Sequence, residues 1–377
     1  MTITKSIISL VALAIATACS GPGGARVDTD NEDNGLASGL RPEKFECTVD
    51  SNAVALYTLT NSNGMEVSIT NYGARVVSIM VPGRDGTLRD VVTGMDSIGQ
   101  YIASGVDWGE IAGRWAGEID SKKLSLPQRR KSWGDMVWKA SLQGDSMVRM
   151  SLIVKPTADG WPGGIQAQVD YSLNDDNTLM CNITAMADRE TWADISPRLY
   201  FNLMGVGDST VSTVDEHIIT SKANEYVRRD SMNNITGETL MTIWTGYDFR
   251  NDISIRRFLK SDFDQKRWAH GLKAYMRVPV SKELSPREML TMRSPSSGVK
   301  LTVLSTYPGF DISTPDNLDG KVAGKHGNIY QKDQAVLIMP HYLPDAPNRQ
   351  YWGIFGRLRP GEIMNEEVIY HFSVSED

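Results

Sequence analysis

Residues 165–185 read IQAQVDYSLNDDNTLMCNITA, and this stretch decides the fold class. Apolar and polar residues alternate from Ile165 to Leu173, which is typical of a β-strand with one buried face and one wet face. Residues 174–177 read NDDN and favour a turn, after which the alternation resumes from Leu179 to Ala185. The stretch therefore predicts a β-hairpin.

Similar patterns recur along the chain. Apolar residues alternate over 65–69 and 77–81, and residues 301–304 and 335–338 are denser apolar runs that indicate more buried strands. Helical periodicity is confined to about one turn near residues 96–102, and no linker composition or fixed repeat follows residue 45. The sequence therefore predicts one large all-β domain over residues 46–377, built as a sandwich or a barrel.

Composition and charge are those of a globular, acidic protein, with 41% hydrophobic and 23% charged residues. The formal net charge is −7, and removal of the single positive charge of Lys5 with the leader described next makes it −8. Binding to a phosphate backbone calls for clustered Lys and Arg residues. We therefore expect no nucleic-acid partner.

The N-terminus resembles a bacterial export signal. Lys5 gives the positive end, residues 7–15 form an apolar core too short to span a bilayer, and small residues precede Cys19 as in lipoprotein signals. We expect residues 1–18 to be a lipoprotein signal peptide and residues 19–45 to be a flexible tether. Lipid on Cys19 would then anchor the protein to a bacterial envelope membrane, the outer membrane. The alternative is an ordinary cleaved signal with an incidental cysteine.

Two further cysteines, Cys47 and Cys181, belong to the mature chain. Cys181 is in phase with the apolar residues Leu179 and Ile183, so we expect it to be a small buried hydrophobic residue. Because an exported protein meets conditions that permit disulfides, a bridge between Cys47 and Cys181 is the alternative.

Short motifs occur in a fixed order along the chain. They are TNSNGMEVSITNYGA at 60–74, GRWA at 113–116, GWPG at 160–163, YFNL at 200–203, TGE at 236–238, YDFR at 247–250, YPG at 307–309, PDAPN at 344–348 and LRPGE at 358–362. Each motif alone is weak. Together they resemble the aldose 1-epimerase (galactose mutarotase) family over residues 55–373.

The resemblance implies a large antiparallel β-sandwich of the galactose mutarotase type, with a sugar-binding cleft on a concave sheet face. Members of the family interconvert the α and β anomers of a free aldose. A carboxylate removes the proton of the anomeric hydroxyl while an imidazole protonates the ring oxygen, which is general acid–base catalysis. The resemblance implies no metal and no organic cofactor.

The family's two proton-transfer positions hold other residues in this chain. Arg198 aligns with the catalytic histidine, and a guanidinium does not release a proton at neutral pH. Met339 aligns with the catalytic glutamate, and a thioether is not a base. Lys273 aligns with a sugar-contacting aspartate and Asp311 with a glutamine, while the segment between Ile119 and Trp138, which carries a second histidine in the family, is shortened.

A relocated acid–base pair is one hypothesis for catalysis. His341 lies two residues after Met339, so on a strand both side chains point to the same face. His341 and Asp311 would form a new catalytic pair if their side chains approach within hydrogen-bond reach. The alternatives are that His341 is a polar lining residue or a histidine with satisfied hydrogen bonds, and that Asp311 is a solvated carboxylate near a loop. The other histidines show no metal-ligand spacing, and we expect no metal site.

Substrate binding is assigned to basic and aromatic residues. If the alignment holds, Arg114, Arg198 and Lys273 line one cleft, which would suit an anionic sugar. The alternative is that the arginines pair with Asp311 or Glu110 and hold the sheet together. Trp108 and Trp115 flank Arg114 and are candidates for stacking on a sugar ring, against the alternative that they are core residues.

Three functions follow in order of preference. The first is a lipid-anchored member of the family that binds a mono- or oligosaccharide and has lost or weakened mutarotase activity. The bound sugar is either neutral or anionic. The second is an active aldose 1-epimerase that acts on a hexose or an anionic sugar through His341 and Asp311. The third is a surface scaffold that uses the sandwich only as a platform.

Overall fold

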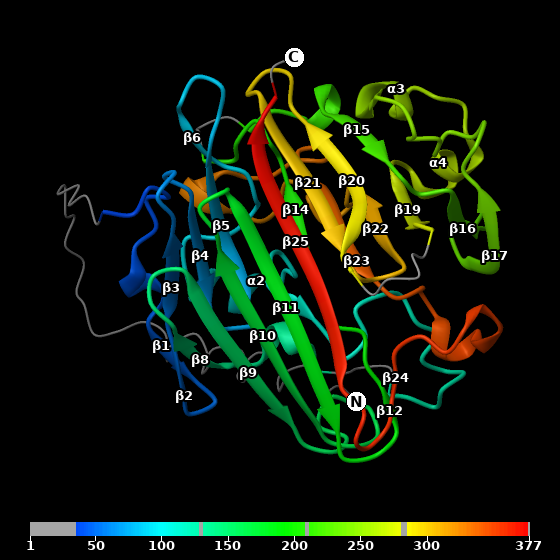
Figure 1. Cartoon of the computed structure of the whole chain (residues 1–377), viewed down its shortest axis with the longest axis horizontal. Coiled ribbons are helices and arrows are strands. Elements are labelled where there is room, and N and C mark those ends of the chain that lie inside the picture. Colours follow the sequence, from blue (N-terminus) through cyan, green and yellow to red (C-terminus); the bar gives the residue numbers. More distant parts are fainter. Residues whose placement is uncertain (1–34, 128–130, 208–210, 280–284, 376–377) are drawn as a thin grey trace, which may run out of the picture.

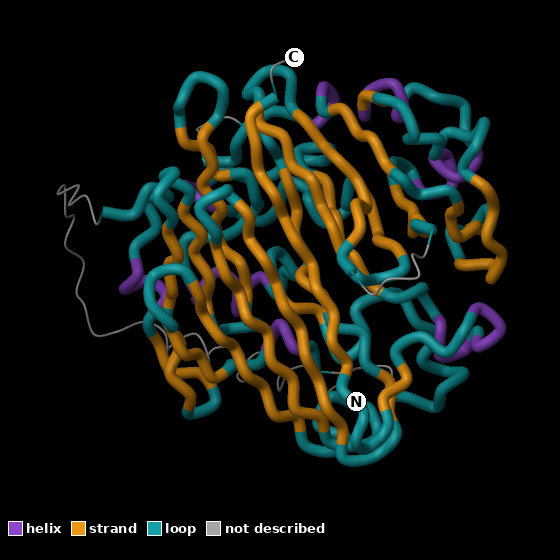
Figure 2. Tube along the Cα trace, viewed as in Figure 1, coloured by secondary structure: helices purple, strands orange, loops and turns teal. Residues whose placement is uncertain are grey.

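The computed structural model describes residues 35–127, 131–207, 211–279 and 285–375. Strands dominate this part of the chain, and the helices are short (Figure 2). The paired strands are antiparallel throughout. The predicted all-β, antiparallel fold is confirmed.

The largest sheet of the described residues has nine strands. Their order is β18 (Ile253–Ser254), β15 (Ile218–Ser221), β20 (Arg287–Arg293), β21 (Val299–Ser305), β25 (Met364–Val374), β11 (Thr178–Ala187), β10 (Ile165–Leu173), β9 (Met147–Val154) and β8 (Lys139–Leu142). β25, β11, β10 and β9 run side by side across the front of Figure 1.

Two sheets lie behind it. The six-stranded one has the order β14 (Leu199–Phe201), β23 (Val336–His341), β22 (Gly309–Ser313), β19 (Lys273–Arg277), β16 (Glu225–Arg229) and β17 (Ile235–Met241). The four-stranded one has the order β3 (Leu56–Thr60), β4 (Glu66–Thr70), β5 (Arg75–Pro82) and β6 (Leu88–Asp90).

The remaining elements are short. Strand pairs are formed by β1 (Cys47–Val49) with β2 (Asn52–Val54), β12 (Thr191–Trp192) with β24 (Arg357–Leu358), and β7 (Ile111–Ala112) with β13 (Ser196–Pro197). The α-helices are α2 (Ile98–Ser104), α3 (Ile255–Leu259) and α4 (Asp264–Ala269). The 3-10 helices are η1 (Pro42–Phe45), η2 (Trp133–Asp135), η3 (Val214–Glu216), η4 (Lys325–Gly327), η5 (Ala346–Asn348) and η6 (Gln350–Trp352).

The predicted hairpin forms as expected. β10 and β11 pair with Leu173 opposite Leu179 and Val169 opposite Ile183, and the alternating apolar residues over 165–173 and 179–185 are buried. These residues join one continuous core that also includes the inner faces of the six- and four-stranded sheets. The layers are therefore held together mainly by burial of apolar side chains.

The N-terminal boundary of the domain differs from the prediction. Residues 36–45 fall within the predicted tether, but Leu40 and Phe45 are buried against the domain. The backbone N–H groups of Ala37 and Ser38 donate to the carboxylate of Glu66 at 2.9 and 3.1 Å. Because this segment buries apolar side chains, it is part of the domain. The predicted signal peptide and Cys19 lie outside the described residues.

Cys47 and Cys181 are not joined by a disulfide, so the alternative of a bridge between them is wrong. Cys181 lies in the core as expected, and burial raises the pKa of its thiol. Within the described ranges, no helix is both long and apolar enough to cross a membrane.

Candidate functional site

The candidate site lies on the face of the six-stranded sheet that points away from the main core. Asp311 of β22 pairs with Met339 of β23, and His341 follows two residues later on the same face. The opposite face carries Phe310 and Ile338, which belong to the main core. We call the outer surface, which carries Arg198, Lys273, Asp311, Met339 and His341, the site face.

The segment that follows β7 covers the middle of the site face. Ala112 and Ala116 pack on Met339, whose exposure falls to 2%. Gly117 lies on the imidazole of His341, and a Cβ atom at this glycine would come within 2.5 Å of Cε1. Only glycine permits this approach. Met339 and His341 are therefore sealed beneath the segment.

His341 lies between two carboxylates. Its Nδ1 atom is 3.2 Å from Oδ2 of Asp194, and its Nε2 atom is 3.2 Å from Oδ2 of Asp311. The second contact has the distance of an ion pair, but not the geometry of a hydrogen bond. The condition set for the hypothetical pair, an approach of His341 to Asp311, is met in distance. Asp194, which also accepts from the backbone N–H of Tyr342, is a partner that sequence reasoning missed.

The two carboxylates hold His341 in its charged form. Burial lowers the pKa of the imidazole, but the charge of Asp311 and the hydrogen bond to Asp194 outweigh burial and raise it to about 9. Burial likewise opposes ionisation of Asp311, yet the imidazolium lowers the pKa of this carboxyl. At neutral pH the group is therefore an imidazolium between two carboxylates.

Arg198 is held by two acidic residues. Its Nη1 atom lies 2.9 Å from Oδ2 of Asp107 and 3.1 Å from Oε1 of Glu110, and Nη2 donates to the carbonyl of Ala116 at 3.0 Å. Burial lowers the pKa of the guanidinium, but the two carboxylates more than reverse this and raise it. The alternative in which an arginine pairs with Glu110 is thus confirmed for Arg198.

Glu110 is itself buried. Desolvation raises the pKa of this carboxyl to about 7, against the opposing charges of Arg198 and Arg75. Arg75 lies 3.5 Å from Glu110 and donates to the carbonyl of Trp108 at 2.7 Å. Glu110 therefore joins the site face to the interior of the domain.

Lys273 is also paired. Its Nζ atom lies 3.1 Å from Oε1 of Glu118, which Arg229 contacts through both terminal nitrogens at 2.8 and 3.1 Å. Burial opposes ionisation of Glu118, but the hydrogen bonds from Arg229 and the two positive charges lower the pKa of its carboxyl. The structure therefore does not support a basic cluster for an anionic sugar, since Arg198 and Lys273 each pair with carboxylates.

Three of the predicted sugar contacts do not reach the site face. Arg114 is buried and paired with Asp159 at 2.9 Å, and it donates to the carbonyl of Gly163. Trp108 is 1% exposed and packs on Tyr330. Their assignment as sugar-binding residues is wrong, because burial leaves neither side chain a surface to offer.

Trp115 is also buried. It is 8% exposed and packs between Trp161 and Trp192, with ring centroids 6.4 and 6.5 Å away. Its predicted stacking on a sugar is wrong, and the alternative of a core residue is confirmed. In the described part of the chain, no three His, Cys, Asp or Glu side chains are placed to hold a metal ion.

Sequence reasoning also missed Glu118 and Arg229. Their pairing depends on the order of strands in the six-stranded sheet, where β16 lies two strands from the strand of Asp311. No local sequence pattern gives a signal for this pairing.

Comparisons with known proteins agree on one family. Residues 55–371 match the family model described as aldose 1-epimerase. The chain is 28% identical to galactose mutarotase of Rattus norvegicus over 331 residues, which covers 83% of this chain and 93% of the relative. It is 26% identical to aldose 1-epimerase of Haemophilus influenzae over 322 residues, covering 81% of this chain and 91% of the relative.

Solved structures show the same fold. The aldose epimerase homologue from C. elegans superposes with a TM-score of 0.75 at 24% identity, over 86% of this chain and all of that one. Galactose 1-epimerase from Lactobacillus acidophilus gives a TM-score of 0.72 at 19% identity, over 87% of this chain and 97% of that one. The predicted galactose mutarotase-like fold is confirmed.

The charge of His341 makes stability depend on pH. The pKa of His341 is about 9 in the folded protein, against an ordinary histidine value of 6.5, so the charge stabilises the fold fully below pH 6.5 and loses this effect as pH rises through 9. We expect the difference in unfolding free energy between the wild type and His341→Gln to shrink by about 3 kcal/mol between pH 6 and pH 10. Urea denaturation of both proteins at the two pH values measures this difference. An equal difference in unfolding free energy at both pH values would contradict the assignment of His341 as an imidazolium in the folded protein.

Proposed function

The chain belongs to the aldose 1-epimerase family, and from this premise we propose that it binds a sugar at the site face without catalysing mutarotation there. One observation carries the proposal. The family resemblance aligns Arg198 and Met339 with the two proton-transfer positions, and neither side chain can exchange a proton near neutral pH.

The first argument concerns the acid. Protonation of a ring oxygen needs a group that gives up its proton close to neutral pH. The ion pairs with Asp107 and Glu110 raise the pKa of Arg198 further above its already high value. Arg198 can therefore donate a hydrogen bond to a sugar, but it cannot transfer the proton.

The second argument concerns the base. Met339 offers a thioether in place of a carboxylate and lies beneath Ala112 and Ala116. A sugar that reached this position would meet an apolar surface. The inherited reaction thus lacks both its donor and its acceptor.

The third argument concerns the relocated pair. A working acid and base must stand on opposite sides of the reacting ring, yet His341 and Asp311 contact each other at 3.2 Å. Asp194 and Gly117 close the other approaches to the imidazole. Their proximity keeps an active epimerase as the second candidate, but the burial of His341 favours a structural role.

Sugar binding is supported by the polar groups that stay accessible. The side chain of Asp311 is 20% exposed, and Lys273 and Glu118 are partly exposed beside it. Carboxylate and ammonium groups of this kind bind hydroxyl groups well. Because every cation of the site face has a carboxylate partner, we propose a neutral sugar in place of the anionic one.

We also propose that the protein is an exported lipoprotein, anchored through Cys19 to the outer membrane of a bacterium. The sequence pattern of residues 1–19 supports this localisation. Mass spectrometry of the membrane-bound form would detect a lipidated Cys19 at the N-terminus.

The absence of mutarotation is tested by polarimetry. We expect freshly dissolved α-galactose and α-glucose to reach their equilibrium rotation at the buffer rate when the full-length protein is added. An active aldose 1-epimerase serves as the positive control. Equilibration well above the buffer rate, abolished by His341→Gln or Asp311→Asn, would establish the relocated pair and overturn the proposal.

Sugar binding is tested by calorimetry with methyl β-galactoside, whose anomeric carbon is fixed. We expect Asp311→Asn to weaken binding about tenfold, because a charge-assisted hydrogen bond becomes a neutral one. The control is Asp170→Asn, which removes a carboxylate that pairs with Arg149 at 2.7 Å on the nine-stranded sheet. If no neutral sugar binds at millimolar concentration, the scaffold function is favoured instead.

A further inference from the structure

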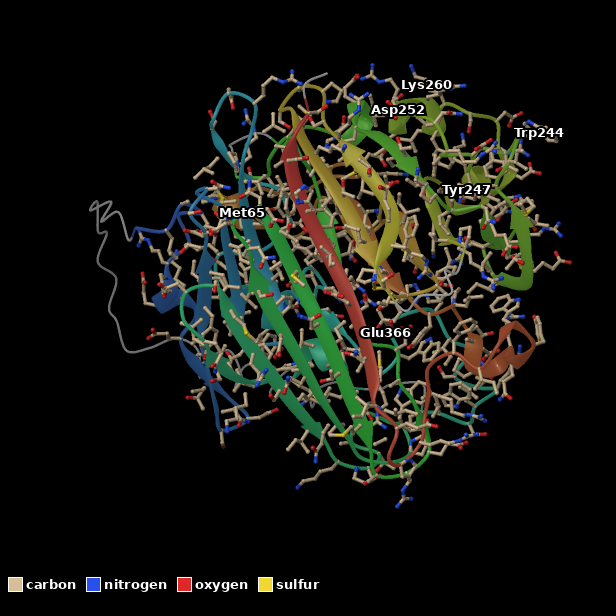
Figure 3. The ribbon with its side chains drawn as sticks, viewed as in Figure 1. Met65, Trp244, Tyr247, Asp252, Lys260 and Glu366 are labelled. Carbon is tan, nitrogen blue, oxygen red and sulfur yellow. The ribbon has the colours of Figure 1, made fainter. Side chains whose placement is uncertain are left out.

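A second candidate site lies away from the site face. A cavity of about 690 Å³ opens between the first half of β25 and the loop of residues 354–363 that carries β24. Glu366 marks its position on β25 (Figure 3). Its volume is typical of a small-molecule site and exceeds what one sugar ring needs.

The cavity and the site face lie on opposite sides of one strand end. His341 points to the site face, whereas the next residue, Tyr342, lines the cavity. Successive side chains on extended backbone point in opposite directions. Asp194 separates the two regions, since it contacts Nδ1 of His341 and the backbone N–H of Tyr342. A ligand in the cavity is therefore a different ligand from one on the site face.

The polar lining of the cavity is rich in acceptors. Glu366 is mostly buried and accepts hydrogen bonds from the hydroxyl groups of Tyr342 and Thr306. Glu367 lies opposite Asn182 in the sheet. The side chains of Asn182, Glu367 and Arg357 have no hydrogen-bond partner among the residues that the structure describes. These groups are available to a ligand.

The apolar lining lies beside these groups. The rings of Tyr342 and Phe355 are tilted against each other with centroids 6.0 Å apart. Ile354 and Ile363 line the same cavity and are 53% and 64% exposed. Aromatic and aliphatic surface of this kind covers the C–H face of a sugar ring, while the polar groups bind its hydroxyls.

The charge of the lining selects among ligands. The cavity lining includes three carboxylates, those of Glu362, Glu366 and Glu367, and one guanidinium, that of Arg357. An anionic ligand would be repelled, whereas hydroxyl groups donate readily to carboxylates. We infer that this cavity is a second carbohydrate site, which takes a neutral oligosaccharide segment of at least two rings.

The test uses methyl β-lactoside, a neutral disaccharide with a fixed anomer, and calorimetry on the full-length protein. The variants are made in a protein that carries Asp311→Asn, because this substitution weakens sugar binding at the site face. In this background, we expect Asn365→Trp to fill the cavity and to weaken lactoside binding at least tenfold. The matched control is Ser373→Trp, on the same strand and the same face but outside the cavity.

A second variant guards against misfolding. Glu367→Ala removes an unpartnered carboxylate without adding bulk, and we expect it to weaken binding in the same direction. Lactoside binding that disappears with Asp311→Asn alone, or that is unaffected by both cavity variants, would overturn the second site while leaving the site face intact. Equal or tighter binding of a sulfated lactoside would contradict the charge argument.

Discussion

The ion pair between Arg198 and Glu110 is the interaction on which the site face depends. Glu110 is buried, and even with Arg198 and Arg75 beside it the pKa of its carboxyl is raised to about 7. Removal of one partner from such a pair leaves a desolvated charge, which costs more than the pair itself contributes. Arg198 is therefore fixed as a structural cation, and its position is closed to a proton donor.

The same logic governs the rest of the site face. His341 is held between Asp194 and Asp311, and Glu118 is held between Arg229 and Lys273. Each buried charge is compensated by a neighbour, as desolvation requires. His341 and Glu118, whose pKa values are shifted away from neutrality, are poor acids and bases near neutral pH, but the groups that stay partly exposed still bind hydroxyl groups. Binding without ring opening is the function that follows.

The sequence predicted the features that depend on local pattern. Alternation over residues 165–185 indicated the β10–β11 hairpin, and strand periodicity placed Met339 and His341 on one face. Residues 36–45 were misjudged because a short apolar segment such as the one around Phe45 gives no periodic signal. Helices α3 and α4 were missed for the same reason, since each spans less than two turns.

Features that depend on contacts between distant segments were less accessible. The pairing of Arg198 with Glu110 was foreseen only as an alternative, and Asp194 was not foreseen at all. Trp108 and Trp115 were misplaced because a tryptophan in the core and one on a sugar site look the same in a sequence. The order of strands in the six-stranded sheet decides which charges meet, and no local pattern reveals that order.

The most direct measurement is a crystal structure of the protein with galactose bound. The account predicts a pyranose on the site face whose ring oxygen lies near the guanidinium of Arg198 and whose anomeric hydroxyl has no free carboxylate within about 3.2 Å. It would be contradicted by a ring that separates His341 from Asp311, with the imidazole and the carboxylate within hydrogen-bond reach of the ring oxygen and the anomeric hydroxyl.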